Sequence, residues 1–292
     1  MTHQAASVLA AAGPPRRLAA RAAAFVLAAA WLLAVPTAAA AGGRPSAPLL
    51  RLESHGPDQG LPQSSVKALA NDDQGFLWVA TQDGLARFDG HRFEVWRGGG
   101  GPRALASGSI DAMVFDASGR RLWLGTNDAG LEVAHLPSWS HVHFDRTDGL
   151  SHNRVSALAL DGQDGAWVGT GAGLDHVSLG ELPRVERLGG DAEVTAVVAL
   201  AGTGVALALD RDCRLRRATR KRADLLTTLQ AGGDCVAMQV GPEGAWAASA
   251  SGSLLLLDPA DGHVRRRLEL TGLDGIPRVT ALLRRADGSL LI

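Results

Sequence analysis

The side chains best suited to chemistry in this sequence are a few histidines, acidic residues and cysteines, and they form no recognised catalytic motif. There is no G-x-S-x-G, no H-E-x-x-H, no Walker loop and no C-x-x-C. His141 and His143 would share one face of a strand, since side chains alternate along it. A zinc site needs a third and usually a fourth ligand, which two histidines do not supply. We therefore predict no catalytic residue and no metal site.

Two other groups of charged residues have simple structural explanations. Asp72–Asp73 and Asp161–Asp164 could bind Ca²⁺, but a glycine follows each of them closely, and turns favour this pattern. The basic run from Arg214 to Arg222 could bind an acidic ligand or protect a sheet edge from pairing, and we favour the edge. The formal net charge of −1 gives no electrostatic argument for nucleic acid as a partner.

The N-terminal segment has the layout of a secretory signal. Three arginines within residues 16–21 precede an uncharged apolar run over residues 22–35, and small residues follow that run. We predict a signal peptide over residues 1–41 and a leader over residues 42–50, with an uncleaved membrane anchor as the alternative. Either segment would place the rest of the chain outside the cytoplasm, and we expect a periplasmic location.

The remainder of the chain, residues 51–292, is built from repeats. The segment GFLWVATQDGLARFDG returns three times, and its tryptophan recurs as Trp78, Trp123, Trp167 and Trp246. A unit of about 40–45 residues with four short strand patterns is typical of a β-propeller blade. We predict an all-β propeller with five four-stranded blades and a truncated sixth, and we expect the ring to be incomplete within this sequence.

Two positions of the repeat are predicted to be structural. The tryptophans should pack between neighbouring blades rather than stack on a ligand. A glycine before the third strand should adopt a backbone conformation that a β-carbon forbids. The glycines at this turn are Gly84, Gly130, Gly173 and Gly252. The fourth unit is degenerate, and we place Ala206 in its tryptophan position. Trp139 falls in the outer-strand region, and we expect its replacement by alanine to cost much less stability than that of Trp78.

A ligand site would lie where the loops of a propeller gather. Connections from a fourth strand to the next first strand, and turns between second and third strands, end on the same face. Their polar residues could bind a ligand or simply form turns. The candidate ligand-binding residues are Gln63, Ser64, Gln82, Asp83, Asn127, Asp128, His152 and Asn153.

The two cysteines of the chain, Cys213 and Cys235, fall on this same face in neighbouring units. Export would place them in an oxidising compartment. Their positions allow a Cα separation short enough for a disulfide, and two free thiols are the alternative. The sequence leaves the pairing open.

The segments GLPQSSVKAL (residues 60–69), DQGFLWVAT (73–81) and DGLARFDG (83–90) resemble the two-component-regulator propeller repeat. The resemblance is good through Val177, weakens in the fourth unit and returns from Val236. It implies the extracytoplasmic sensor region of a bacterial membrane receptor, dimeric at full length, with a histidine kinase, hybrid kinase or diguanylate cyclase as its output. The form of the motif is most similar to the sensors of diguanylate cyclases.

The resulting expectation is a non-enzymatic module without a cofactor that senses an unknown small molecule or glycan. A secreted propeller enzyme of the lyase or glycosidase type is one alternative, but the loops offer neither paired carboxylates nor a histidine base at corresponding positions. A passive scaffold for protein contacts is the other. A transmembrane segment and an output domain beyond Ile292 would favour the sensor.

Overall fold

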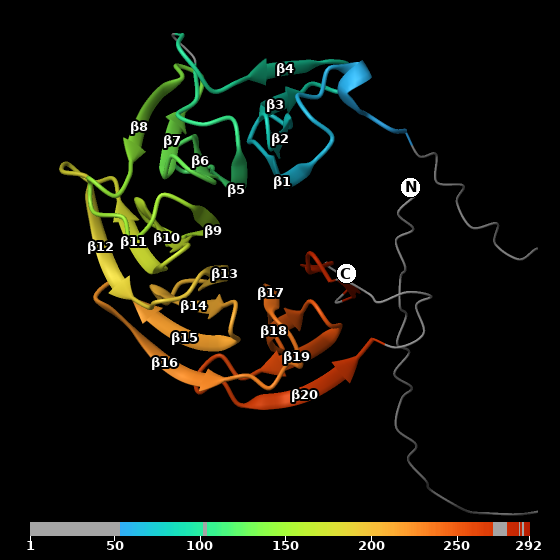
Figure 1. Ribbon diagram of the computed structural model, residues 1–292, viewed down its shortest axis with the longest axis vertical. Helices are drawn as coiled ribbons and strands as arrows, with labels where there is room; N and C mark the ends of the chain where they lie inside the picture. Colours follow the sequence, from blue (N-terminus) through green and yellow to red (C-terminus); the bar gives the residue numbers. More distant parts are fainter. Residues whose placement is uncertain (1–52, 102–103, 271–278, 286, 288) are drawn as a thin grey trace, which may run out of the picture. The chain divides into compact units, whose positions relative to one another are not determined.

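The described part of the chain is a succession of small antiparallel sheets. The computed structural model describes residues 53–101, 104–270, 279–285, 287 and 289–292 (Figure 1). The predicted signal peptide lies outside these residues. Among the residues described, no helix is both long and apolar enough to cross a bilayer.

Each four-stranded sheet forms one blade, with its strands hydrogen-bonded in chain order. A 3-10 turn, η1 (Pro57–Gln59), precedes the first blade. Blades 1 and 2 contain β1 (Val66–Asn71), β2 (Leu77–Thr81), β3 (Gly84–Phe88), β4 (Phe93–Trp96), β5 (Ile110–Asp116), β6 (Arg121–Thr126), β7 (Leu131–His135) and β8 (Ser140–Phe144). Blades 3 and 4 contain β9 (Val155–Leu160), β10 (Gly165–Thr170), β11 (Gly173–Ser178), β12 (Arg184–Gly189), β13 (Val194–Leu200), β14 (Val205–Asp210), β15 (Arg214–Thr219) and β16 (Arg222–Thr228). Blade 5 contains β17 (Cys235–Gly241), β18 (Gly244–Ser249), β19 (Ser253–Leu257) and β20 (Val264–Glu269), and a two-stranded sheet of β21 (Leu283–Arg284) and β22 (Leu290–Leu291) follows.

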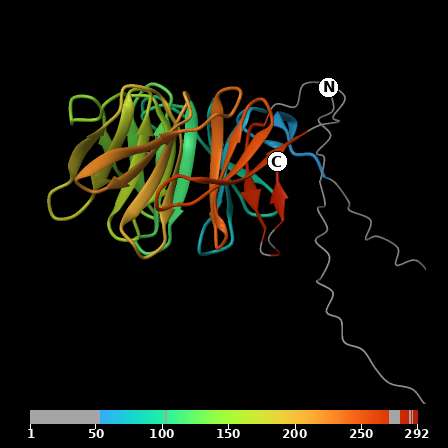
Figure 2. The ribbon, with the colours of Figure 1, turned by 90° about the horizontal axis from the view of Figure 1, so that it is seen from below.

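The blades stand around a common axis. The first strands β1, β5, β9, β13 and β17 contact one another in that order, and β21 follows β17. In Figure 1 these strands lie innermost, and the fourth strands β4, β8, β12, β16 and β20 lie outermost. Figure 2 shows the blades from the side, with their turns gathered at the two ends of the strands. The predicted propeller fold is confirmed.

The core lies between the blades, and the repeat tryptophans fill it. Trp78 belongs to the cluster at the junction of blades 1 and 2, Trp123 to that of blades 2 and 3, and Trp167 to that of blades 3 and 4. Trp246 packs against Val279 and other residues that follow blade 5. Each of these rings is at most 6% exposed. Alternation along the second strand therefore directs the largest side chain of each repeat into the gap beside the next blade.

Strand pairing corrects the assignment made for blade 4. Leu207 pairs with Arg217 in the same register in which Trp78 pairs with Arg87. The tryptophan position is therefore occupied by Leu207, whose side chain is fully buried between blades 4 and 5. Ala206 lies one residue earlier and packs at the junction of blades 3 and 4. The connection from the first to the second strand is one residue longer in blade 4 than in blade 3, since Val198 pairs with Leu207 whereas Ala159 pairs with Trp167, and this shifts the sequence alignment by one residue.

Trp139 is buried, which its assignment to the outer-strand region did not predict. It lies in the turn between β7 and β8 with φ 59°, and only 5% of it is exposed. Its ring stacks on Trp96 at 4.7 Å and on Trp78 at 5.9 Å between ring centroids. The left-handed backbone of this residue turns the indole back across the blade junction, which strand alternation cannot reveal.

The glycine before the third strand is required by close packing. At Gly130, φ is 98° and a β-carbon would lie 2.2 Å from the carbonyl oxygen of Phe144. Blade 5 departs from this pattern, because the pairing of Leu254 with Ala248 places Ser253 in the equivalent position. Gly252 precedes it with φ 98°. The assignment of Gly252 to this position is thus corrected by one residue.

Candidate functional site

One end of the blades carries the turns between second and third strands together with the connections between blades, and we call it the loop face. Backbone hydrogen bonds join these two kinds of segment within a blade. The Asn127 N–H donates to the Ser109 carbonyl at 2.9 Å, and the Gly171 N–H donates to the Arg154 carbonyl at 2.9 Å. Further bonds cross from one blade to the next, as from the Gly130 N–H to the Asn153 carbonyl at 2.8 Å. These bonds tie the loops of blades 2 and 3 to one another.

The candidate residues of blade 1 lie on this face and are partly engaged with their own loops. Gln63 accepts a hydrogen bond from the Ser65 N–H at 2.8 Å. Asp83 forms an ion pair of 2.6 Å with Arg97, which also donates to its carbonyl. Gln82 is exposed, as is Ser64. This group thus offers an amide and a hydroxyl at the surface, with the carboxylate already paired.

The candidate residues of blades 2 and 3 also lie on the loop face. Asn153 accepts the Arg146 N–H on its side-chain oxygen at 2.9 Å while its carbonyl receives the bond from blade 2. The His152 Nδ1 accepts the Arg154 N–H at 2.9 Å, so the hydrogen of its neutral ring lies on Nε2. Asn127, Asp128 and His152 are exposed. These loops thus leave an amide, a carboxylate and an imidazole group exposed on the loop face.

A chain of ion pairs at the inner edge of the loop face was missed by the sequence analysis. Arg154 lies 3.4 Å from the Asp111 carboxylate and 2.8 Å from that of Glu193. Glu193 also pairs with Arg211. The two carboxylates are largely buried, whereas Arg154 is 39% and Arg211 50% exposed. We call these four residues the axial charge network; it links blades 2, 3 and 4.

The sequence did contain a signal for this network. The residue directly before the first strand is serine in blades 1 and 2, but Arg154 in blade 3, Glu193 in blade 4 and Asp234 in blade 5. Aligning the units at this position would have shown opposite charges meeting from neighbouring blades.

Two buried acidic residues hold the loops from below. Asp175 on β11 is fully buried and accepts two hydrogen bonds from Ser151, one from its N–H at 2.7 Å and one from its hydroxyl at 2.6 Å. Burial raises the pKa of Asp175, and the bonds from Ser151 only partly oppose this. Glu132 in blade 2 accepts the Ala106 N–H at 2.8 Å in the corresponding place. Both carboxyls fix a loop and lie too deep to touch a ligand on the surface.

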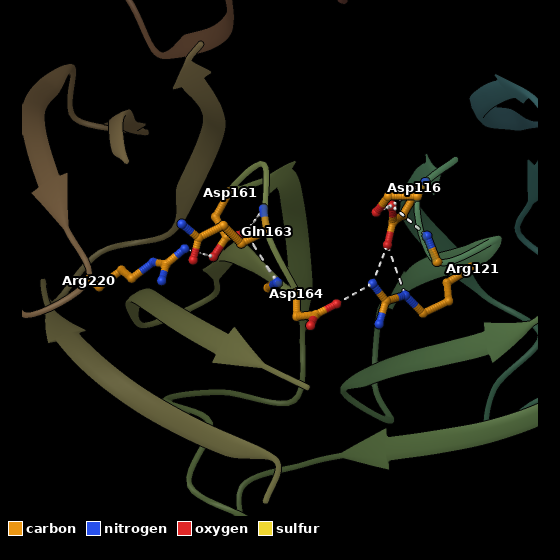
Figure 3. Close-up of polar contacts among 9 residues, drawn as sticks. Asp116, Arg121, Asp161, Gln163, Asp164 and Arg220 are labelled. Atoms are coloured by element: carbon orange, nitrogen blue, oxygen red, sulfur yellow. Dashed lines mark hydrogen bonds and ion pairs between the residues drawn. The ribbon is translucent and has the colours of Figure 1, made fainter. Parts of the chain in front are cut away.

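A second set of bridges lies at the opposite end of the blades (Figure 3). Arg121 of blade 2 binds Asp116 of its own blade at 2.5 Å and Asp164 of blade 3 at 3.0 Å. Arg220 of blade 4 reaches Asp161 of blade 3 at 2.8 Å. Arg220 belongs to the basic run, which therefore supplies a link between blades as well as a sheet edge. The equivalent pairs elsewhere are Arg120–Asp73 at 3.0 Å and Arg284–Glu243 at 3.1 Å.

Two carboxyl groups in these bridges, those of Asp116 and Asp161, have a lowered pKa. Burial would raise the pKa of Asp116, but hydrogen bonds from Ser118, Arg121 and Gly119 outweigh it and hold that pKa below its ordinary value. Asp161 behaves in the same way, with bonds from the Gln163 N–H and from His176 opposing burial to lower its pKa. The acidic pairs considered for Ca²⁺ are thus occupied by turn and ion-pair contacts.

His143 has more neighbours than the sequence suggested. Its ring lies near Asp145 and Asp148, with the nearest ligand atoms of the three within 4.8 Å of one another. These groups already serve other contacts: His143 bonds the Ala129 carbonyl, and Thr147 donates to Asp145. The two aspartates supply the further ligand types that the sequence analysis did not consider beside His143, but their contacts are those of the turn that they stabilise.

The loop face also carries the disulfide that the sequence had left open. Cys213, in the turn between β14 and β15, is bonded to Cys235 at the start of β17, with 5.1 Å between their Cα atoms. Both residues are buried. The bond joins blade 4 to blade 5 beside Arg211, whose carbonyl accepts the Cys235 N–H at 3.1 Å.

Comparison with known proteins agrees with this architecture. Residues 60–83 match the family model described as the two component regulator propeller. The chain carries a two-component-regulator propeller repeat. A stretch of 46 residues is 50% identical to histidine kinase P4 of Formosa agariphila, and it covers 16% of this chain and 3% of the kinase.

Solved propellers resemble most of this chain. The extracellular domain of the putative hybrid two component system BT3049 of B. thetaiotaomicron has a TM-score of 0.67 and 18% identity, over 82% of this chain and 33% of that domain. The corresponding domain of BT4673 has a TM-score of 0.59 and 15% identity, over 78% of this chain and 30% of that domain. The WD40 propeller of Doa1 matches with a TM-score of 0.59 and 16% identity, over 77% and 74%. Likeness at these identities shows the fold, and this propeller spans about a third of the two B. thetaiotaomicron domains.

Proposed function

We propose that this propeller is the extracytoplasmic sensor of a bacterial signalling receptor and that its loop face binds the stimulus, a small polar molecule or a glycan. The observation that carries the proposal is the axial charge network. It brings charged groups from three blades to the inner edge of the loop face, beside loops rich in amide and hydroxyl groups. Polar groups that converge on a rigid scaffold are what a specific binding site requires.

The arrangement favours binding and transmission over catalysis. Arg154 contacts both Asp111 and Glu193, so each carboxylate already faces a cation. A ligand that competes for Arg154 or Arg211 would weaken contacts among blades 2, 3 and 4 and so change their geometry. We propose a histidine kinase or a diguanylate cyclase as the receiving output. The resemblance of the repeat supports this, as does the likeness to a histidine kinase and to hybrid two component systems.

Location is tested by fusing alkaline phosphatase after Ile292 in a bacterial host, because that enzyme is active only outside the cytoplasm. We expect an active phosphatase fusion. An inactive phosphatase fusion beside an active β-galactosidase fusion at the same point would contradict export.

Binding is tested by thermal denaturation with monosaccharides, oligosaccharides, amino acids and dicarboxylates. We expect at least one compound to raise the Tm of the wild type and to lose this effect in Arg154→Ala. Arg266→Ala is the matched control, since Arg266 is an exposed arginine on the outer strand β20. Equal stabilisation of all three proteins, or unchanged signalling by a full-length receptor carrying Arg154→Ala, would count against the loop face as the sensing site.

A further inference from the structure

A buried carboxyl group in blade 2 has one oxygen without a hydrogen-bond partner. Glu132 on β7 is 1% exposed, and its Oε2 accepts the Ala106 N–H at 2.8 Å. No group among the described residues donates to its Oε1. Buried polar atoms are nearly always hydrogen-bonded, because an unpaired one costs free energy. The Glu132 Oε1 therefore lacks a donor that its burial calls for.

An imidazole ring lies close to this oxygen. The Nδ1 atom of His141, on the outermost strand β8, is 3.9 Å from the Glu132 Oε1, whereas a hydrogen bond needs about 2.7–3.2 Å. The His141 side chain is 38% exposed, so its ring can exchange protons with solvent. Histidine is the side chain that ordinarily changes charge between about pH 5 and pH 8. The protonated ring has the N–H and the positive charge that this oxygen lacks.

Blade 3 holds the equivalent carboxyl group in a different way. Asp175 has the register position of Glu132, and Ser151 bonds both of its oxygens, one by its N–H and the other by its hydroxyl. On the outermost strand β12, Val185 has the register position of His141. Blade 2 lacks the serine hydroxyl and carries a histidine in place of the valine. The two differences occur together at one carboxyl group, which indicates that the histidine supplies the partner of the second oxygen.

The other ionisable side chains that the neighbouring elements carry on this side of blade 2 are bonded to other groups. These side chains are His143 on β8, Asp145 and Asp148 beyond it, Arg87 on β3, Glu94 on β4 and Arg97 in the connection to blade 2. His143 bonds a backbone carbonyl at 2.5 Å, and the two aspartates accept bonds within their own turn. Arg87 pairs with Glu94 at 2.7 Å, and Arg97 pairs with Asp83 at 2.6 Å.

We propose that His141 and Glu132 form a latch beneath the loop face that closes in mild acid. The imidazolium moves onto Oε1 and forms the missing charge-assisted bond, and the latch opens when the ring loses its charge. The Oε2 bond to Ala106 ties the latch to the connection before β5. The Ser109 carbonyl of that connection accepts the Asn127 N–H at 2.9 Å, so closing the latch steadies one of the candidate loops. The latch does not depend on the proposed function, because it acts on the free protein.

The test compares urea unfolding of the wild type and His141→Val at about pH 5.5 and about pH 8. The latch stabilises the folded state when His141 is charged, so its contribution is present in mild acid and is lost as pH rises. We expect the unfolding constant of the wild type, relative to that of the variant, to be about three- to tenfold lower at the acid pH. His91→Val is the matched control, since His91 is exposed in the turn between β3 and β4. Its ratio to the wild type should not change with pH.

A second variant examines the same oxygen through another donor. Ala106→Ser places a hydroxyl beside Glu132, as Ser151 does for Asp175 in blade 3. Adding His141→Val in this background should change stability by an amount that depends on pH by less than about twofold. Hydrogen exchange over residues 104–109 gives the local readout. It should be slower in the wild type than in His141→Val at the acid pH and equal in the two proteins at the higher pH.

Three results would overturn the proposal. One is the same pH dependence of stability in the wild type and His141→Val. Another is an equal change in pH dependence in His91→Val, and the third is an undiminished effect of His141→Val in the serine background. If valine prevents folding, His141→Gln replaces it in every comparison, because glutamine keeps the polarity of the side chain without its change of charge.

Discussion

The junction between blades 2 and 3 and the junction between blades 4 and 5 join equivalent surfaces by different means. In the first, Trp123 fills the core and Arg121 reaches Asp164 across the gap at 3.0 Å. In the second, Leu207 takes the tryptophan position. No arginine–carboxylate pair joins blades 4 and 5 among the residues described, and a disulfide links them on the loop face instead.

This difference shows how a degenerate repeat is tolerated in a ring of blades. The stability of a repeat array is close to a sum of unit and neighbour terms, so one weak interface is a local fault. A leucine buries less area than a tryptophan, and loss of an ion pair removes an orienting contact. A cross-link restricts the unfolded chain and restores stability at that interface without any added side-chain volume.

Removing the aromatic ring between blades 2 and 3 should have the largest effect on stability. Trp123→Ala removes a fully buried side chain and should lower the free energy of unfolding by about 3–5 kcal/mol. Urea denaturation measures this loss. Leu182→Ala is the control, because Leu182 is 71% exposed and should change stability by less than about 0.5 kcal/mol. Similar midpoints for the two variants would contradict the blade junction as described.

Removing the disulfide between blades 4 and 5 should have the second largest effect on stability. The Cys213→Ala/Cys235→Ala double variant loses a bond that spans 22 residues, which corresponds to roughly 3 kcal/mol of stability. Urea midpoints of the oxidised wild type and the double variant give the value. A double variant as stable as the wild type would show that the interface does not rely on the bond.

The buried carboxyl beneath the loop of blade 3 should make stability depend on pH. Burial raises the pKa of Asp175 above 3.8, so the folded state binds this proton more tightly than the unfolded state does. The stability it contributes is present at low pH and is lost as pH rises through the raised pKa. We therefore expect the free energy of unfolding of Asp175→Asn to rise relative to that of the wild type as pH increases above about 4, as measured by urea unfolding at each pH. A difference independent of pH would refute this account.

The smallest effect should come from the exposed end of the bridge between blades 2 and 3. Asp164 is 70% exposed, so Asp164→Ala should cost less than about 1 kcal/mol and less still at high salt. Thermal unfolding at low and high ionic strength measures both. A loss as large as that in Trp123→Ala would mean that the bridge, and not the ring, holds this junction.

The sequence predicted those features that repeat with a fixed spacing. Trp78, Trp123, Trp167 and Trp246 revealed the blades, because alternation and period alone place a tryptophan between sheets. The role of Leu207 was not predicted, because an irregular turn changed the sequence register of blade 4. The burial of Trp139 was not predicted, because it depends on the backbone angle of a turn.

The candidate site was less predictable, for a related reason. The loops themselves could be located from the order of strands. Arg154 and Glu193 meet across blade boundaries, and a pair distant in sequence leaves no periodic trace in either unit. The sequence showed that a disulfide between Cys213 and Cys235 was possible. The pairing itself depends on how blades 4 and 5 are positioned, which brings the two Cα atoms to 5.1 Å.

The most direct test of this account is hydrogen exchange by mass spectrometry on the oxidised and the reduced protein. If the disulfide substitutes for the tryptophan and the arginine bridge, reduction should accelerate exchange in β14 and β17, on either side of the cross-link. Exchange in β6 and β10, at the junction filled by Trp123, should stay unchanged. Equal acceleration in both regions, or none in either, would contradict the claim that the two junctions are held together by different means.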